Sequence, residues 1–316
     1  MRLVVPLLNS NQEEELHTPR NLRQTEDAAP QPDQTSDKSN SREDADSKGI
    51  AGKEAVCFVF PSASQLGVIL RHISVALRSD ALGFRFNSQG IRISQMDMRH
   101  VVLAQMYIPS SSLSYYRIDN GSQDLLIRVG AGKWLDRLRM AGNQPVEVTV
   151  TPPEFEDSRG YTICFALKNE KMQLFAESFD EENLGEPSFP KPVRATVLLD
   201  EFVSALRVFL RWNEQTVTIS ARESAPSIFL RTGSEGGVFE TSVRATKLFL
   251  DGGLAVESTY NSTDLAKLVS GVPSAISVSI CFGQGSPLIV EHAVPVVYGQ
   301  GVITLTYYLA PRATET

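Results

Sequence analysis

The sequence predicts an α+β fold in which two similar domains each place two helices on one face of antiparallel sheets. Three observations lead to this prediction. Apolar and polar residues alternate along many short segments, four longer segments carry apolar residues at helical spacing, and the order of these segments repeats in the second half of the chain. An element with one apolar face needs another element to cover it, so a repeated order indicates two domains of similar design.

The chain has 316 residues, of which 42% are hydrophobic, and is long enough to bury two cores. We expect a disordered tail over residues 1–53, because polar and acidic residues dominate there and few apolar groups offset the entropy cost of ordering. The two domains are expected over residues 54–178 and 195–312. Residues 179–194 between them hold an acidic run followed by prolines, which predicts a stiff and exposed connector.

Strands are predicted where apolar side chains recur at every second position, because successive side chains of a strand point to opposite faces. Phe84 and Phe86, for example, alternate with Arg85 and Asn87. The same alternation occurs in segments 91–94, 146–150, 276–280 and 303–307. Turn sequences that contain glycine separate the strands. Most of the body is therefore expected to be antiparallel sheet.

Four helices are predicted against this β-rich background, each with apolar residues three and four positions apart. Their apolar stripes occupy segments 66–77, 134–141, 202–209 and 265–269. Gly142 ends the second helix, Asp200 and Glu201 favour the start of the third, and the run from Ser262 to Asp264 caps the fourth.

The charge distribution matters more than the net charge of −7, which by itself argues against a nucleic-acid partner. Basic residues gather on the polar faces of the helices, whereas the rest of the body is acidic. On any single helix, the basic residues could simply form an ordinary solvent-exposed face. Because the same pattern occurs in three of the four helices, we favour a surface that binds an anionic partner. The spacing suits sequence-independent contact with phosphates. The candidate DNA-contacting residues are Arg71, His72, Arg78, Lys133, Arg137, Arg139, Arg207, Arg211 and Lys267.

Several short motifs occur in the order found in one known family. Segment 90–103 reads GIRISQMDMRHVVL and continues in YYRID at 115–119; LRMAGN at 138–143, PLIVE at 287–291 and YYLAP at 307–311 follow. Over residues 55–311 the chain resembles the proliferating-cell nuclear antigen (PCNA) family of DNA sliding clamps. Only Lys267 represents the basic residues of the family's last helix.

The resemblance implies the DNA-clamp fold and a homotrimeric ring, with the helices lining the hole and the sheets forming the rim. Such a ring encircles double-stranded DNA without sequence preference and acts as a processivity factor. Expected partners are DNA polymerase, a clamp loader and other replication and repair proteins that carry PCNA-interacting peptides. The expected location is the nucleus, or the replication site of a virus.

The resemblance also implies an apolar pocket beneath the connector for a short peptide of the Gln-x-x-aliphatic-x-x-aromatic-aromatic kind. Met and Pro adapt to varied apolar partners, and a Tyr hydroxyl offers a polar contact at the edge. Plain core packing remains an alternative for Met96 and Leu103, as does a structural role for His100. The candidate pocket residues are Met96, His100, Leu103, Leu184, Pro187, Phe189, Pro287, Tyr308, Ala310 and Pro311.

Other functions find little support in the sequence. The segment from Gly130 to Lys133 resembles a phosphate loop, but Ile127 replaces the first glycine and Trp134 replaces the magnesium-binding hydroxyl. The histidines show no metal-ligand spacing, and the three cysteines fit buried thiols. We therefore expect no enzyme activity, no cofactor, no metal and no membrane association. The closer alternative is a subunit of a heterotrimeric checkpoint clamp, which shares the fold.

Overall fold

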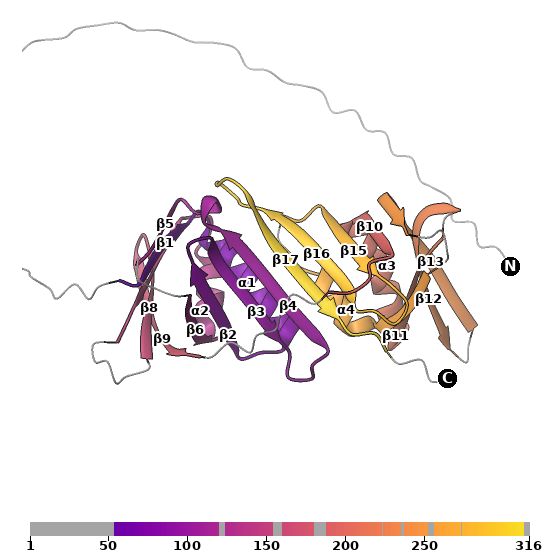
Figure 1. Cartoon of the computed structure of the whole chain (residues 1–316), viewed down its shortest axis with the longest axis horizontal. Helices are drawn as coiled ribbons and strands as arrows, with labels where there is room; N and C mark the ends of the chain where they lie inside the picture. Colours follow the sequence, from indigo (N-terminus) through magenta and orange to yellow (C-terminus); the bar gives the residue numbers. More distant parts are fainter. Residues whose placement is uncertain are drawn as a thin grey trace, which may run out of the picture. The chain divides into compact units, whose positions relative to one another are not determined.

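The computed structural model describes residues 54–119, 124–153, 160–179, 188–222, 224–234, 237–251, 256–272 and 274–312 (Figure 1). The chain divides into two units after Lys48, and every described residue belongs to the second unit. The tail expected over residues 1–53 and positions 180–187 of the expected connector lie outside the described residues. The proposed domain boundaries stay predictions.

The first half of the described chain runs strand, helix, five strands, helix, three strands. Its elements are β1 (Val56–Phe60), α1 (Ala63–Leu77), β2 (Ala81–Asn87), β3 (Gly90–Met96), β4 (Val102–Pro109), the short 3-10 helix η1 (Ser110–Ser112), β5 (Tyr115–Ile118), β6 (Leu125–Gly130), α2 (Lys133–Met140), β7 (Val146–Thr151), β8 (Gly160–Leu167) and β9 (Glu170–Ser178).

The second half repeats this order with one strand fewer between its helices. Its elements are β10 (Val193–Leu198), α3 (Leu199–Arg211), β11 (Thr216–Arg222), β12 (Ala225–Ser234), β13 (Gly237–Leu250), β14 (Val256–Asn261), α4 (Ser262–Val269), β15 (Ser277–Phe282), β16 (Leu288–Pro295) and β17 (Val302–Leu309). The repeated order predicted from the sequence is confirmed.

All pairings among the described strands are antiparallel and join them into one continuous sheet. The strand order is β5-β1-β7-β8-β9-β6-β2-β3-β4-β17-β16-β15-β10-β13-β12-β11-β14. The two halves meet at the β4–β17 pair, which runs from Val102 opposite Leu309 to Tyr107 opposite Thr304. Segments some 200 positions apart along the chain therefore share one hydrogen-bonded ladder at the centre of the sheet.

The four helices lie on one side of the central strands (Figure 1). Contacts link α2 to α1, α1 to α4 and α4 to α3, so the helices form a single layer. Gly67 permits the close approach of α1 to α2, because a Cβ at this position would lie 2.6 Å from the backbone nitrogen of Arg139. Ser62 caps α1 by accepting a hydrogen bond from the backbone N–H of Gln65 at 3.2 Å.

The main apolar core fills the space between this helix layer and the sheet. A second, smaller apolar cluster is formed by Leu103 and Tyr308, which pair across β4 and β17, together with Ile289. Because Val102 and Tyr307 belong to the main core, strand alternation places Leu103 and Tyr308 on the opposite face of the sheet from the helices.

The predicted elements differ from the observed ones mainly at their ends. Ile276 was expected on the buried face of a strand, but it is 78% exposed and β15 begins one residue later. The cap of α4 is Asn261, whose side chain accepts from the backbone N–H of Asp264 at 2.9 Å. None of the helices in the described residues is long and apolar enough to span a membrane.

Candidate nucleic-acid surface and partner pocket

The predicted basic residues lie on the sides of the helices that face away from the core. In α1 the buried side chains include Ile69, Leu70 and Ile73, and in α3 they include Leu206 and Phe209. The opposite sides are therefore open to solvent. Exposed residues are Arg71, Arg78, Lys133, Arg137, Arg139, Arg207 and Arg211, whereas Lys267 is half-buried.

Four of these cations are paired with carboxylates and four are not. Arg137 pairs with Glu170 and Arg139 with Asp136, while Arg78 and Lys267 share Asp264. Within the described part of the chain, no ion pair involves the other four, which we call the unpaired cations: Arg71, Lys133, Arg207 and Arg211. They are the residues best placed to receive an anionic partner.

His72 was predicted as a DNA contact, and this prediction is wrong. The side chain is only 8% exposed and its Nδ1 lies 2.6 Å from the hydroxyl of Tyr307 in the interior. Burial lowers the pKa of His72 to about 4, since desolvation disfavours the charged ring. A buried, neutral imidazole cannot contact phosphate. At position 72 the helix turns its inner side toward the sheet, one residue after exposed Arg71.

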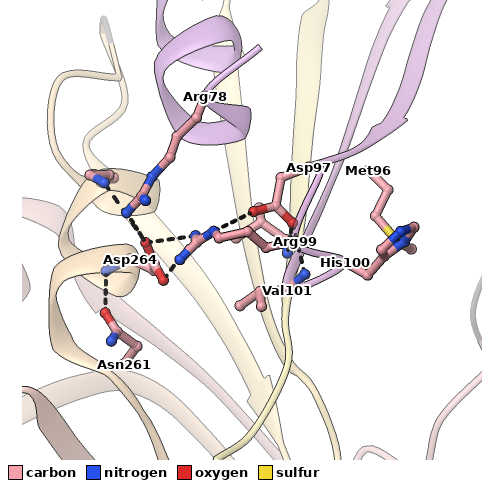
Figure 2. A network of polar contacts seen from close by, with 10 residues as sticks. Arg78, Met96, Asp97, Arg99, His100, Val101, Asn261 and Asp264 are labelled. Atoms are coloured by element: carbon pink, nitrogen blue, oxygen red, sulfur yellow. Dashed lines mark hydrogen bonds and ion pairs between the residues drawn. The ribbon is translucent and has the colours of Figure 1, made fainter.

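A polar network joins α4 to the loop between β3 and β4 (Figure 2). The carboxylate of Asp264 accepts hydrogen bonds from Arg78 Nη2 at 3.1 Å and from Arg99 Nη2 at 3.2 Å to each oxygen. Arg99 also donates through Nε to Asp97 Oδ2 at 3.1 Å. Burial alone would lower the pKa of Arg99, but its bonds and attraction to Asp264 and Asp97 raise it overall.

Asp97 fixes the conformation of the loop that carries His100. Its Oδ1 accepts from the backbone N–H groups of Val101 and Val102 at 2.7 and 2.9 Å. His100 takes a left-handed backbone conformation with φ of 55°, and its Nδ1 lies 3.1 Å from the sulfur of Met96. The exposed imidazole therefore stands beside Met96 at the edge of the second apolar cluster (Figure 2).

The second apolar cluster brings together the central residues of the predicted partner pocket. Leu103 and Tyr308 are 5% and 9% exposed, and half-buried Met96 packs against them. Pro287, Ala310 and Pro311 are half-buried as well, and the backbone N–H of Ala310 donates to the carbonyl of Val101 at 2.9 Å. Phe189 is 37% exposed, while Leu184 and Pro187 lie outside the described residues.

Sequence reasoning missed some residues of both regions. Ile289 and Cys281 belong to the second cluster, and alternation along β16 and β15 could have indicated that they share its face. No local pattern signals the pairing of Arg99 with Asp264, because 165 positions separate these residues. The sequence suggested a cap role for Asp264; the structure shows a buried carboxylate that binds three cations.

Comparisons with known proteins agree with this geometry. No protein-family model matches the chain. The DNA polymerase sliding clamp of Pyrococcus horikoshii is 25% identical over 264 residues, which cover 81% of this chain and 98% of the relative. The DNA polymerase sliding clamp of Thermococcus sibiricus is 25% identical over 252 residues, covering 75% and 90%. The matches thus extend over nearly the full length of these relatives.

Solved structures match the fold across the described halves. The PCNA structure from Entamoeba histolytica aligns with a TM-score of 0.67 at 16% identity and covers 83% of this chain and 100% of its own. In sequence and in fold the chain is similar to the PCNA family of sliding clamps. A further PCNA structure, from Thermococcus kodakaraensis, aligns with a TM-score of 0.67 at 18% identity, covering 81% of this clamp and 100% of its own chain.

These alignments confirm the DNA-clamp fold expected from the sequence. Within the described residues, no group of three or more His, Cys, Asp or Glu side chains is arranged to hold a metal ion. Within the described residues, the helix-borne cations of this chain divide into a set paired with carboxylates and the unpaired cations.

Proposed function

We propose that this clamp closes with further copies, three in all, into a ring that encircles duplex DNA and tethers a polymerase to it. The observation that carries the proposal is the single layer of helices with the unpaired cations Arg71, Lys133, Arg207 and Arg211 on its open side. Arg and Lys contacts to phosphate are independent of base sequence, so a ring held by topology can slide along DNA.

Two strand edges support closure into a ring. In β9, the segment Glu170–Phe175 pairs only with β8, and in β13, Gly237–Arg244 pairs only with β12, among the described strands. Open edges are templates for pairing with another chain. Phe175 and Val238, which lie on these edges, are 68% and 62% exposed. Because the two edges differ, pairing one with the other gives a head-to-tail contact, the type that closes into rings.

The second apolar cluster supports a docking role. Leu103, Ile289 and Tyr308 lie on the face of the sheet opposite the helices, so a peptide bound there leaves the cationic layer free. The expected occupants are polymerases, a clamp loader and other replication or repair proteins that carry the short apolar and aromatic motif. A nuclear location belongs to the same proposal.

A heteromeric ring is the second candidate. The clamp structure from Sulfolobus tokodaii that aligns with a TM-score of 0.65 at 17% identity is a PCNA2-PCNA3 complex, two different clamp chains in one assembly. Light scattering during size-exclusion chromatography distinguishes the candidates. A trimer of this chain alone supports the homotrimer, whereas a stable monomer favours a heteromeric ring such as a checkpoint clamp.

Primer extension on a long circular template tests the tethering function. With a cognate loader and polymerase, the clamp should lengthen the products. Combined replacement of Arg207 and Arg211 with Gln should reduce this gain while preserving the oligomer. Product lengths that are identical with and without the clamp would refute the tethering function.

A further inference from the structure

Asp264 stands out because it is a buried carboxylate beside the open side of the helix layer. Its side chain is 5% exposed, while Arg78, Arg99 and Lys267 around it are 48%, 42% and 30% exposed. The three cations therefore surround a carboxylate that is itself nearly inaccessible to solvent, and Figure 2 shows Arg78 and Arg99 reaching it from the end of α1 and from the β3–β4 loop. Only the carboxylate of these pairs is buried, and leaving a buried carboxylate without a charged partner is costly, so Asp264 favours keeping its cations in place.

The cations around Asp264 come from both halves of the chain. Arg78 follows the last residue of α1 in a left-handed conformation with φ of 49°, Arg99 belongs to the β3–β4 loop, and Lys267 lies one turn along α4. The left-handed turn at position 78 ends α1 beside α4. The fold thus holds these charges at the junction of the two central helices.

Because Arg78 and Lys267 are paired with Asp264, they should bind phosphate more weakly than cations without such a partner. Arg78 and Lys267 would have to leave a carboxylate at 3.1 and 3.8 Å before engaging another anion fully. With Asp97 included, the cluster holds three cations and two carboxylates, a net charge of about +1. The unpaired cations carry no such cost.

We propose that Asp264 weakens the hold of this clamp on DNA by retaining Arg78 and Lys267, so that the junction of α1 and α4 contributes little to phosphate binding. The inference rests on the proposed encirclement of DNA and assigns the contacts within it. The unpaired cations bind phosphate, and the Asp264 cluster forms a weakly attractive strip between them. A weaker hold favours sliding, since each phosphate contact must break for the ring to move.

The test measures binding of the full chain to a short fluorescent duplex across a salt titration. The variant Asp264→Asn keeps the side-chain shape but removes the charge that retains Arg78 and Lys267. It should bind several-fold more tightly at low salt, and the slope of log Kd against log salt should become steeper by roughly one to two phosphate equivalents. A purely structural role for Asp264 would not steepen this slope.

The matched control is Asp124→Asn, which makes the same charge change at the Arg85 pair beside strand β6. It should leave the salt slope unchanged. Adding Arg78→Gln to Asp264→Asn should restore much of the original slope, because the released guanidinium is then absent. An unchanged slope in a folded Asp264→Asn variant overturns the proposal.

Single neutral variants keep the proposal testable if Asp264→Asn does not fold. Arg78→Gln and Lys267→Gln should leave the slope unchanged, whereas Arg71→Gln should flatten it by about one. If Arg78→Gln flattens the slope of log Kd against log salt, Arg78 already binds phosphate and the inference about Asp264 is overturned. The proposal that the ring encircles DNA would not be affected by that result. Failure of the combined Arg207→Gln and Arg211→Gln variant to weaken binding instead counts against DNA encirclement itself.

Discussion

The rings of His72 and His292 both pack against the ring of Tyr307 in the interior, and the two imidazole centroids lie 6.5 Å apart. His292 Nε2 lies 2.9 Å from the carbonyl oxygen of Leu268, so the cluster links α1, α4 and the central strands. Burial lowers the pKa of each histidine to about 4, and the proximity of His72 adds to this effect on His292. Both rings are therefore neutral in the folded clamp near pH 7.

This burial predicts a loss of stability in mild acid. The unfolded chain takes up protons at the ordinary histidine pKa of about 6.5 and the folded chain only near 4, so the free energy of unfolding falls as pH drops between these values. The loss at about pH 5 should be roughly 2 kcal/mol per ring. Urea unfolding at about pH 7.5 and pH 5 measures it. The His292→Gln variant should lose less of its free energy of unfolding between these pH values, because one titrating ring is absent. Equal free energies of unfolding of the unmodified clamp at both pH values would contradict the prediction.

Cys281 offers a reporter for the partner pocket. Its half-buried thiol packs against the second apolar cluster, whereas Cys57 is buried elsewhere with a pKa raised to about 11, first by burial and then by nearby Glu54 and Glu147. A peptide of the Gln-x-x-aliphatic-x-x-aromatic-aromatic kind should slow alkylation of Cys281 by iodoacetamide at least several-fold. Labelling of Cys57 is the internal control.

Replacing Tyr308 with Ala should abolish most of this protection, because the ring fills the cluster beside Leu103. Mass spectrometry of labelled peptides gives the rates. Protection of Cys281 that persists in the Tyr308→Ala variant would place the peptide elsewhere.

At the scale of the elements, the contact between α1 and α2 leaves no room for a side chain at Gly67. A methyl group at Gly67 would lie 2.8 Å from Leu138 Cβ as well as 2.6 Å from a backbone nitrogen of the facing helix. Neither neighbour is a flexible side-chain end, so the helices would have to separate. The orientation of Lys133 on the surface depends on this packing, since it begins α2.

Gly67→Ala should therefore destabilise the clamp by roughly 1–3 kcal/mol, the usual cost of overpacking. Gly130→Ala is the matched control, because its nearest neighbour would be an oxygen of Asp80 at 3.9 Å. Thermal unfolding of both variants gives the comparison. Similar midpoints for the two variants would show that the helices adjust without cost.

The elements themselves could be predicted from the sequence because their signals are local. Alternation in β17 and the apolar stripe of α1 are complete within one segment. The Asp264 network and the β4–β17 pair depend on residues far apart in the chain, so periodicity gives no access to them. The prediction for His72 failed because it followed from the basic character of the side chain and not from its position around the helix. Arg71 lies on the exposed side of the helix, whereas His72, one residue later, is buried.

At the scale of the whole molecule, the open edges of β9 and β13 predict how assembly can be disrupted. Val238→Lys places a charge on an exposed apolar position of the β13 edge and should shift the clamp toward monomers. Ile276→Lys is the matched control, since Ile276 is similarly exposed, at 78%, but precedes β15 and lies on neither edge. Light scattering reports the masses. Loss of assembly in both variants, or in neither, would contradict this assignment of the edges.

The ladder between β4 and β17 has a mechanical consequence. Six residue pairs, continued by the bond from Ala310 to Val101, cross the middle of the subunit, and the Asp264 cluster spans the same junction on the helix side. Bending of the subunit at this junction would break the β4–β17 hydrogen bonds and the Asp264 ion pairs together. Each subunit is therefore expected to behave as a rigid body. In the proposed ring, the opening through which DNA enters should then lie at a joint between neighbouring subunits.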